Sequence, residues 1–220
     1  EYAKDTKLNL DAVLLRSTLD ADVAQGCAVA ALAAYMQAHV FHYPEYRHLH
    51  LAEHLDATFR VEQRDILRRG DEYDIDVFQR VIDVNLVGTM RCCLAAQPLL
   101  ANSKGSIVNM ASMLSTFGGP LVPAYSASKG GVSQLTKALA GQWAESGIRV
   151  NAIAPGWIET EMTQGLRDNQ DRAKDIMART PMKRWGKTSE VGALVRWLLS
   201  DEASFVTGSV YPVDGGYLAM

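Results

Sequence analysis

A tyrosine and a lysine four residues apart are the side chains in this sequence best suited to chemistry. Tyr125 and Lys129 lie in the segment YSASK, and on a helix this spacing puts both side chains on one face. A phenol with an ordinary pKa of about 10 is a poor acid or base at neutral pH, whereas a nearby ammonium group favours the phenolate and lowers that pKa. The pair therefore predicts a lysine-tuned tyrosine that transfers a proton in general acid/base catalysis.

A Tyr-x-x-x-Lys spacing can also occur by chance on a solvated helix face. The position of Ser112 argues against a chance occurrence here. Ser112 follows the β-rich run SIVNM and precedes Tyr125 by thirteen residues. Open parallel sheets bind their ligands beyond the carboxyl ends of their strands. The placement predicts that Ser112 and Tyr125 meet at one site.

The elements that would position these side chains alternate between helices and strands. A long, mostly buried helix is expected from Asp74, closed by Pro98 and Gly105. The elements expected after it are a strand over 106–110, a helix over 124–145, a strand over 149–153, a helix that Thr188 or Ser189 caps and that ends near Leu199, and a strand over 209–213. Weaker patterns favour a strand over 12–16, a helix over 23–38 and two short strands around Pro44. This alternation is typical of the α/β class with a doubly wound parallel sheet.

Composition and charge narrow the classes of protein to consider. With 220 residues and 48% hydrophobic content, the chain can bury the core of one α/β domain without disulfides or metals. The net charge of −3 and the absence of long like-charge runs argue against nucleic acid and anionic membranes as partners, and favour a small-molecule substrate. Three cysteines, two of them adjacent, argue against a disulfide framework and favour the cytoplasm. We expect no export signal and no membrane anchor, because the longest apolar stretch, 27–36, is about half the length of a membrane span.

Several further segments, with those above, resemble the short-chain dehydrogenase/reductase family. The family pattern is matched by VNLVG around Asn85, GSIVNMAS ending in Ser112, YSASK, NAIAPGWIET and VTGSVYPVDGG. ILRRGDEYD, ASMLS, RWG and DGGYLA look most like its sugar-acid branch, the 2-deoxy-D-gluconate and 2-keto-3-deoxygluconate dehydrogenases and gluconate 5-dehydrogenases. The resemblance implies a single Rossmann-like domain over 1–220, with a divergent or shortened cofactor half over 1–65 and a catalytic half over 66–220.

The resemblance also implies an activity and roles for the catalytic residues. The protein would be an oxidoreductase dependent on NAD or NADP that interconverts a secondary alcohol and a ketone, and it would assemble as a homo-oligomer, a tetramer or a dimer. Tyr125 would transfer the proton at oxygen, Ser112 would orient that oxygen, and Lys129 would also hold the nicotinamide ribose. Asn85 would hold a water molecule in the proton relay; the alternative is a helix-interior amide bonded to backbone.

A second set of residues resembles the family's nicotinamide loop. Pro155, Gly156, Ile158 and Thr160 match the segment that packs on the nicotinamide and binds its carboxamide. For Thr160, a plain helix N-cap role is the alternative.

The first third of the chain departs from the family pattern. Members carry a Thr-Gly-x3-Gly-x-Gly turn, because only glycine lets the backbone approach a pyrophosphate closely. Residues 17–24 align with this turn, so Thr18, Asp22 and Ala24 stand at the glycine positions, where side chains would crowd the phosphates and the Asp22 carboxylate would repel them. The family's Asn-Asn-Ala-Gly segment is also replaced, by residues 63–65. Three explanations stay open: an altered or abandoned cofactor site, a sequence that is part of a longer chain, or a reading-frame error upstream of about residue 66.

Two other features of this region leave questions open. All five histidines lie between His39 and His54, which suggests a metal site, but HLHLAEHL is as well explained by a strand entering a helix, and no cysteine or carboxylate pair completes a ligand set. We expect no metal. Glu45 could bind the adenosine ribose hydroxyl of NAD, and Arg47 could bind the corresponding phosphate of NADP, so the sequence does not distinguish the two cofactors.

Two other functions compete with the sugar-acid dehydrogenase. A non-redox or regulatory protein could have kept the fold, lost dinucleotide binding and used the Tyr125 pocket for binding or acid/base chemistry alone; the residues at positions 18, 22 and 24 favour this alternative. A 3-oxoacyl-thioester reductase would share all the catalytic residues.

Overall fold

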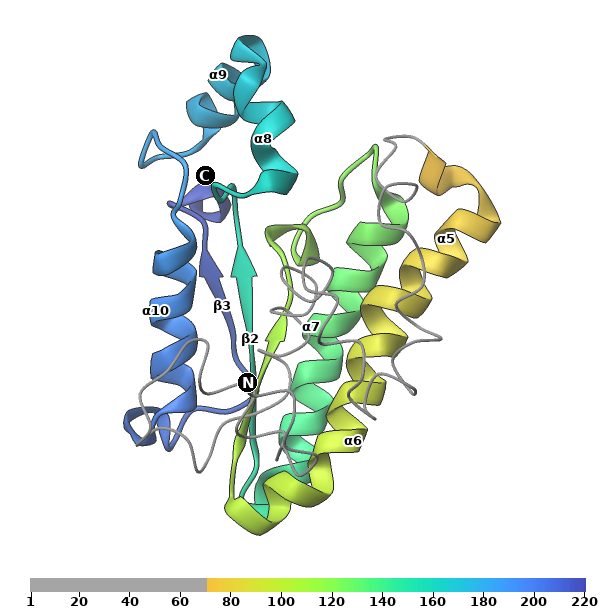
Figure 1. Ribbon diagram of the computed structural model, residues 1–220, viewed down its shortest axis with the longest axis vertical. Coiled ribbons are helices and arrows are strands. Elements are labelled where there is room, and N and C mark those ends of the chain that lie inside the picture. Colours follow the sequence, from red (N-terminus) through yellow and green to blue (C-terminus); the bar gives the residue numbers. More distant parts are fainter. Residues whose placement is uncertain (1–70) are drawn as a thin grey trace, which may run out of the picture.

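The computed structural model describes residues 71–220, in which helices and strands alternate around a parallel sheet (Figure 1). The elements are η5 (Asp71–Tyr73), α5 (Ile75–Ile82), η6 (Asp83–Val87), α6 (Gly88–Ser103), β1 (Ser106–Met110), η7 (Met113–Ser115), α7 (Pro123–Trp143), η8 (Ala144–Ser146), β2 (Arg149–Pro155), α8 (Glu161–Asp168), α9 (Gln170–Arg179), α10 (Thr188–Leu199), η9 (Asp201–Ala203), β3 (Val210–Val213) and η10 (Tyr217–Ala219). The predictions that fall on residues 1–70 lie outside the described residues; they include the strand over 12–16, the helix over 23–38, the turn over 17–24, the histidines, Glu45, Arg47 and the segment 63–65.

The described sheet has the order β1-β2-β3, and both pairs of strands are parallel. In the register, Val108 lies opposite Asn151 and Ile153 lies opposite Tyr211. Helices cover both faces: α10 lies on one side of the sheet, and α6 and α7 lie on the other (Figure 1). The predicted parallel α/β fold is confirmed, and so are its strands within one or two residues.

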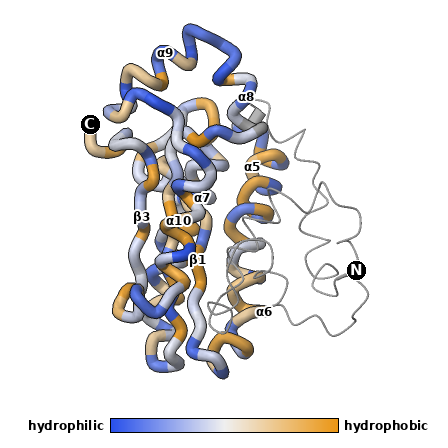
Figure 2. Tube along the Cα trace, turned by 60° about the vertical axis from the view of Figure 1, so that its left-hand side comes forward, coloured by the Kyte–Doolittle hydropathy of each residue, from blue (hydrophilic) through white to orange (hydrophobic). Residues whose placement is uncertain are grey.

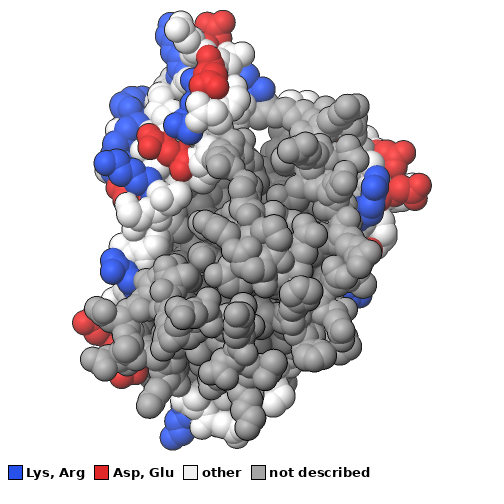
Figure 3. Space-filling view, viewed as in Figure 1, with Lys and Arg blue, Asp and Glu red and all other residues white. Residues whose placement is uncertain are grey.

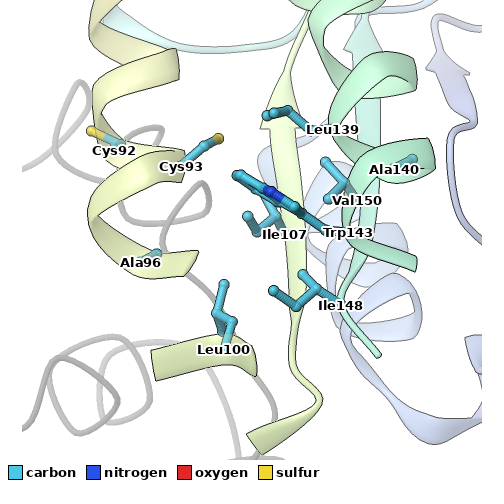
Figure 4. Packing of buried hydrophobic residues seen from close by; sticks show 10 residues of the cluster. All are labelled: Cys92, Cys93, Ala96, Leu100, Ile107, Leu139, Ala140, Trp143, Ile148 and Val150. Carbon is cyan, nitrogen blue, oxygen red and sulfur yellow. The ribbon is translucent and has the colours of Figure 1, made fainter. Parts of the chain in front are cut away.

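Alternation of side chains along β1 explains why two successive residues at its centre, Ile107 and Val108, are both apolar. Ile107 packs with α6 and α7, in a cluster that includes Cys93, Trp143 and Val150 (Figure 4). Val108, the next residue, packs on the opposite face with residues of α10. A strand buried on both faces needs apolar side chains at successive positions, and this requirement produces the run SIVNM.

One long helix, Ile75–Ser103, is formed by α5, η6 and α6. A π-helical turn, η6, interrupts it. Pro98 lies inside α6 rather than at its end, so the prediction that Pro98 closes the helix is wrong. A proline here leaves the Leu94 carbonyl without the N–H group that it would accept in a regular helix, and this is tolerated because Leu94 and Pro98 are both exposed, so that water can reach the carbonyl. The helix ends at Lys104, which adopts the left-handed conformation, and Gly105 then donates its N–H to the Leu100 carbonyl.

By length and composition alone, this same helix could cross a membrane. Within the fold, however, Cys92, Cys93, Ala96 and Leu100 of α6 pack against the sheet. Core packing therefore accounts for part of the apolar character of the helix; 28% of an apolar 18-residue window in it is buried, so the prediction of a mostly buried helix is wrong.

Two polar helices, α8 and α9, stand beyond the carboxyl end of the sheet, and the sequence analysis did not include them (Figure 1). Their trace is largely hydrophilic (Figure 2), and charges of both signs gather over them at the surface (Figure 3). Of the two, only α9 has a fully buried side chain among those described, Ile176. Few of their residues are apolar, so hydrophobic periodicity gave only a weak signal. Their capping residues, Thr160 and Asn169, were the available signal.

Candidate functional site

Ser112 lies just beyond β1, where the chain leaves the sheet. The N–H group of the preceding residue, Ala111, still donates to the Ile153 carbonyl of β2 at 2.8 Å. Ser112 then begins η7: its Oγ accepts the N–H of Leu114 at 3.2 Å, and its own N–H donates to Ser115 Oγ at 3.2 Å. These bonds hold the hydroxyl of Ser112 at the carboxyl end of the strand.

Tyr125 and Lys129 reach the same place from the first turns of α7. The Ser112 hydroxyl lies close enough to the Tyr125 phenol to influence its pKa. Lys129 Nζ lies 5.6 Å from the centre of the Tyr125 ring and donates to the Met110 carbonyl at 2.9 Å. The structure therefore brings together three of the predicted catalytic residues, although their roles in a reaction stay predictions.

The pKa of Tyr125 is raised above its ordinary value. Burial is the main cause, the nearby Ser112 hydroxyl acts in the opposite direction, and the Glu72 carboxylate adds to the effect of burial. The expected lowering of this pKa by Lys129 is not found, because the loss of water around the phenol outweighs other effects. Lys129 is itself buried, and burial lowers its pKa from 10.5 to about 8.

Asn85 lies in the π-helical turn η6 and faces α7. Its side-chain amide donates to Ser128 Oγ at 3.1 Å, and Ser128 Oγ donates to the Tyr125 carbonyl at 2.8 Å. The backbone carbonyl of Asn85 accepts from Thr89 Oγ1 at 2.7 Å. The amide is thus bonded to a side-chain hydroxyl rather than to backbone, which was the alternative, and the water-holding role stays a prediction.

The predicted nicotinamide loop begins at the end of β2. Pro155 is the last residue of that strand, and Gly156 donates its N–H to the Val213 carbonyl of β3 at 3.0 Å. A Cβ atom at Gly156 would lie 2.7 Å from Asp214 Cβ, so this crossing of two chain segments requires glycine.

Ile158 and Thr160 continue this loop toward α8. Ile158 is buried and forms an isolated parallel bridge with Gly186. Thr160 is the N-cap residue of α8, which was the alternative to a role in binding the nicotinamide. Its N–H donates to Thr163 Oγ1 at 3.1 Å. No contact in the described part of the chain tests the role of either residue toward a carboxamide.

A group of aromatic side chains near this loop was missed by the sequence reasoning. Trp157 makes edge contacts with Trp185 and Tyr217, at ring-centre distances of 5.9 and 6.4 Å. Phe117 stacks on Tyr217 at 6.1 Å, and the Arg179 guanidinium lies 4.6 Å from the centre of the Tyr217 ring. Four chain segments contribute, and spacing along the sequence does not indicate which aromatic residues meet.

Glu72 was also missed, although it contacts the backbone of Tyr125. Its carboxylate accepts the N–H of Tyr125 at 2.9 Å. The available signal was indirect: α7 begins at Pro123 after Val122, a residue without a side-chain acceptor, so the first N–H groups of the helix need an acceptor from elsewhere.

Comparison with known proteins places the chain among dehydrogenases. A family model described as enoyl-(acyl carrier protein) reductase matches residues 9–218. The 2-dehydro-3-deoxy-D-gluconate 5-dehydrogenase of Bacillus subtilis is 43% identical over 152 residues, which cover 69% of this chain and 60% of that protein. A protein of the same name from Dickeya dadantii is 40% identical over 173 residues, which cover 77% of this chain and 68% of that protein.

A solved structure gives the same result. A candidate 2-deoxy-D-gluconate 3-dehydrogenase from Agrobacterium tumefaciens, solved with bound NADP, is 43% identical and has a TM-score of 0.66, with 70% of this chain and 64% of that chain covered. The matched part of our chain thus spans about three fifths of the length of the Bacillus relative. The family model spans nearly the whole chain, and the resemblance found in the sequence is confirmed: the chain belongs to the short-chain dehydrogenase/reductase family.

Proposed function

We propose that the protein is an oxidoreductase dependent on NAD or NADP that interconverts a secondary alcohol and a ketone on a sugar or sugar acid. One observation carries the proposal: the Ser112 hydroxyl, the Tyr125 phenol and the Lys129 amine meet at the carboxyl end of β1, where Lys129 Nζ lies 5.6 Å from the centre of the phenol ring. The substrate class is supported by the names of the relatives from Bacillus subtilis and Dickeya dadantii.

The described residues fit a nicotinamide at the carboxyl ends of β1 and β2. The indole Nε1 of Trp157 is buried there without a hydrogen-bond partner in residues 71–220, and such a donor calls for an acceptor. The residues that would hold the group are those matching the family pattern: Lys129 at the ribose, and Pro155, Gly156, Ile158 and Thr160 at the nicotinamide. When bound, the nicotinamide would supply or accept the hydride at carbon.

The residues of this chain would handle the substrate oxygen. The pKa of Tyr125 is raised, so its phenol is protonated at neutral pH and can donate a proton to a carbonyl oxygen during reduction. The Ser112 hydroxyl would hold that oxygen in place. In alcohol oxidation the phenol must first lose its proton, and the ammonium group of Lys129 would stabilise the phenolate.

Substitution of Tyr125 by phenylalanine tests the assignment, because it keeps the ring and removes only the hydroxyl. We expect turnover with sugar-acid substrates, followed as nicotinamide absorbance, to fall by at least about a hundredfold. The far-ultraviolet circular dichroism of the variant should match that of the wild type. An unchanged turnover number would refute the role of Tyr125.

A second candidate is a protein that kept this fold and does not bind a dinucleotide. Thr18, Asp22 and Ala24, at positions where the family has glycine, favour it. Titration with NADH and NADPH, followed by nicotinamide fluorescence, separates the two candidates. Saturable binding supports the oxidoreductase, whereas no binding by folded protein supports the second candidate. If a dinucleotide binds, a comparison of sugar acids with 3-oxoacyl thioesters as substrates distinguishes the proposed activity from a thioester reductase.

We also propose a homo-oligomer, a dimer or tetramer, that works in the cytoplasm. Exposed apolar side chains on α6, Leu94 and Leu99, support self-association. The two buried, unpaired cysteines of α6 are consistent with a reducing compartment. Light scattering coupled to size-exclusion chromatography measures the assembly directly, and a monomer at micromolar concentration would contradict it.

A further inference from the structure

Glu72 is a buried carboxylate that the proposed reaction does not use. Only 4% of its surface is exposed. It lies in η5, 53 positions before the residue that it contacts: its Oε2 atom accepts the backbone N–H of Tyr125 at 2.9 Å. Buried carboxylates are rare unless they are paired or hydrogen-bonded, so this contact calls for an explanation.

The helix that carries Tyr125 lacks an N-terminal cap of its own. Its N-cap residue, Val122, has no side-chain acceptor, and Pro123 has no N–H group. Glu72 fills the missing role, and its negative charge lies at the positive end of the helix dipole. The adjacent Tyr73 binds the preceding loop, since its hydroxyl donates to the Pro120 carbonyl at 2.9 Å. Two neighbouring side chains of η5 thus fix the start of α7.

The same carboxylate bears on the ionisation of the phenol. The groups that face Tyr125 from the described elements are Glu72 from η5, Lys129 from its own helix and the uncharged Ser112 beyond β1. A negative charge close to a phenol opposes formation of the phenolate, so Glu72 adds to the effect of burial in raising the pKa of Tyr125.

We propose that Glu72 is a positioning residue of the site: its carboxylate holds the backbone of Tyr125 at the start of α7 and sets the electrostatic surroundings of the phenol. The consequence for proton transfer rests on the function proposed above. The contact and its charge do not, because both belong to the folded chain alone.

A glutamine at position 72 separates the two parts of this role. The Glu72→Gln variant keeps an oxygen that can accept the N–H of Tyr125 and removes the charge. The pKa of Tyr125 is read from the nuclear magnetic resonance of protein labelled with carbon-13 at tyrosine Cζ, and the signal is assigned by its loss in the Tyr125→Phe variant. We expect this pKa to be lower in Glu72→Gln than in the wild type. In alcohol oxidation, turnover on the acidic side of the pH profile should rise by about threefold or more.

The matched control is Asp76→Asn, which removes an exposed negative charge four residues away. It should leave the pKa of Tyr125 unchanged, since solvent screens an exposed charge. Equal pKa values for Tyr125 in the wild type and in Glu72→Gln would overturn the proposal. The titration needs neither substrate nor dinucleotide, so a lowered pKa in an inactive protein would refute the proposed function and support the role of Glu72.

If the Glu72→Gln variant does not fold, the Glu72→Asp variant tests the positioning role of Glu72. This variant keeps the charge on a shorter side chain, so the hydrogen bond to Tyr125 lengthens. Hydrogen exchange of the Tyr125 amide should then become faster by about tenfold or more, because the bond that protects it is weakened. An exchange rate equal to that of the wild type would overturn the positioning role.

Discussion

Replacing Lys129 by methionine removes a buried titratable group whose contribution to stability depends on pH with a definite sign. Burial lowers the pKa of Lys129 from 10.5 to about 8 in the folded protein. Between these two values the unfolded chain holds the proton and the folded protein has largely released it. Because the unfolded state then binds more protons, the free energy of unfolding increases as the pH rises.

The size of the effect follows from the two pKa values of Lys129. Each unit of difference corresponds to about 1.4 kcal/mol, so the full window is worth about 3 kcal/mol. Between pH 7 and 9.5 the gain is about 2 kcal/mol. Methionine has a similar length and does not titrate. The free energy of unfolding of the Lys129→Met variant should therefore lack this pH-dependent contribution.

Urea unfolding followed by tryptophan fluorescence measures the difference between wild type and Lys129→Met at each pH. Other titrating groups are common to both proteins, and their contributions cancel in the difference. Lys137→Met, a change at an exposed lysine of the same helix, is the control and should give a difference that does not vary with pH. A difference for Lys129→Met that stays constant within about 0.5 kcal/mol would refute the burial of an ionisable amine at this position.

Two further predictions concern packing around the site. In Gly156→Ala the new Cβ would lie 2.7 Å from Asp214 Cβ, and we expect a loss of about 1–3 kcal/mol of stability in urea unfolding, together with weaker dinucleotide binding. The control is Gly141→Ala, on α7 with open space around it, which should not destabilise the protein. Equal effects at the two glycines would contradict the steric argument. In Thr136→Val the buried Asn109 amide loses the acceptor that it has at 2.9 Å, so we expect a similar loss of about 1–3 kcal/mol, and a stability equal to that of the wild type would show that the amide finds another partner.

The parts of the fold that could be predicted from the sequence are those with strong local signals. The strand β1 was predicted with its observed bounds, because a strand buried on both faces is rich in apolar, β-branched residues at successive positions. The helix α10 was predicted from its amphipathic pattern to follow a cap at Thr188 or Ser189 and to end near Leu199; it is observed over Thr188–Leu199, with Lys187 as the N-cap. Ser112, Tyr125 and Lys129 could be placed together because they follow or begin such elements.

The parts that escaped prediction depend on contacts between distant segments. Glu72 reaches Tyr125 only because η5 and the start of α7 lie side by side in the fold. The raised pKa of Tyr125 depends on burial, which a helical spacing to Lys129 does not reveal. The spacing identified the right pair of residues, but the sign of the pKa shift required the surroundings of the phenol.

The π-helical turn Asp83–Val87 determines how α5 is rotated about the helix axis relative to α6. Each residue of an α-helix advances the chain by about 100° and 1.5 Å. Deleting one residue from this turn would turn the segment before it by about that angle relative to α6. η5 would rotate with α5, and Glu72 would lose its contact with the backbone amide of Tyr125. A deletion fifteen positions or less from Glu72 in the sequence would therefore break its contact with a residue on another helix.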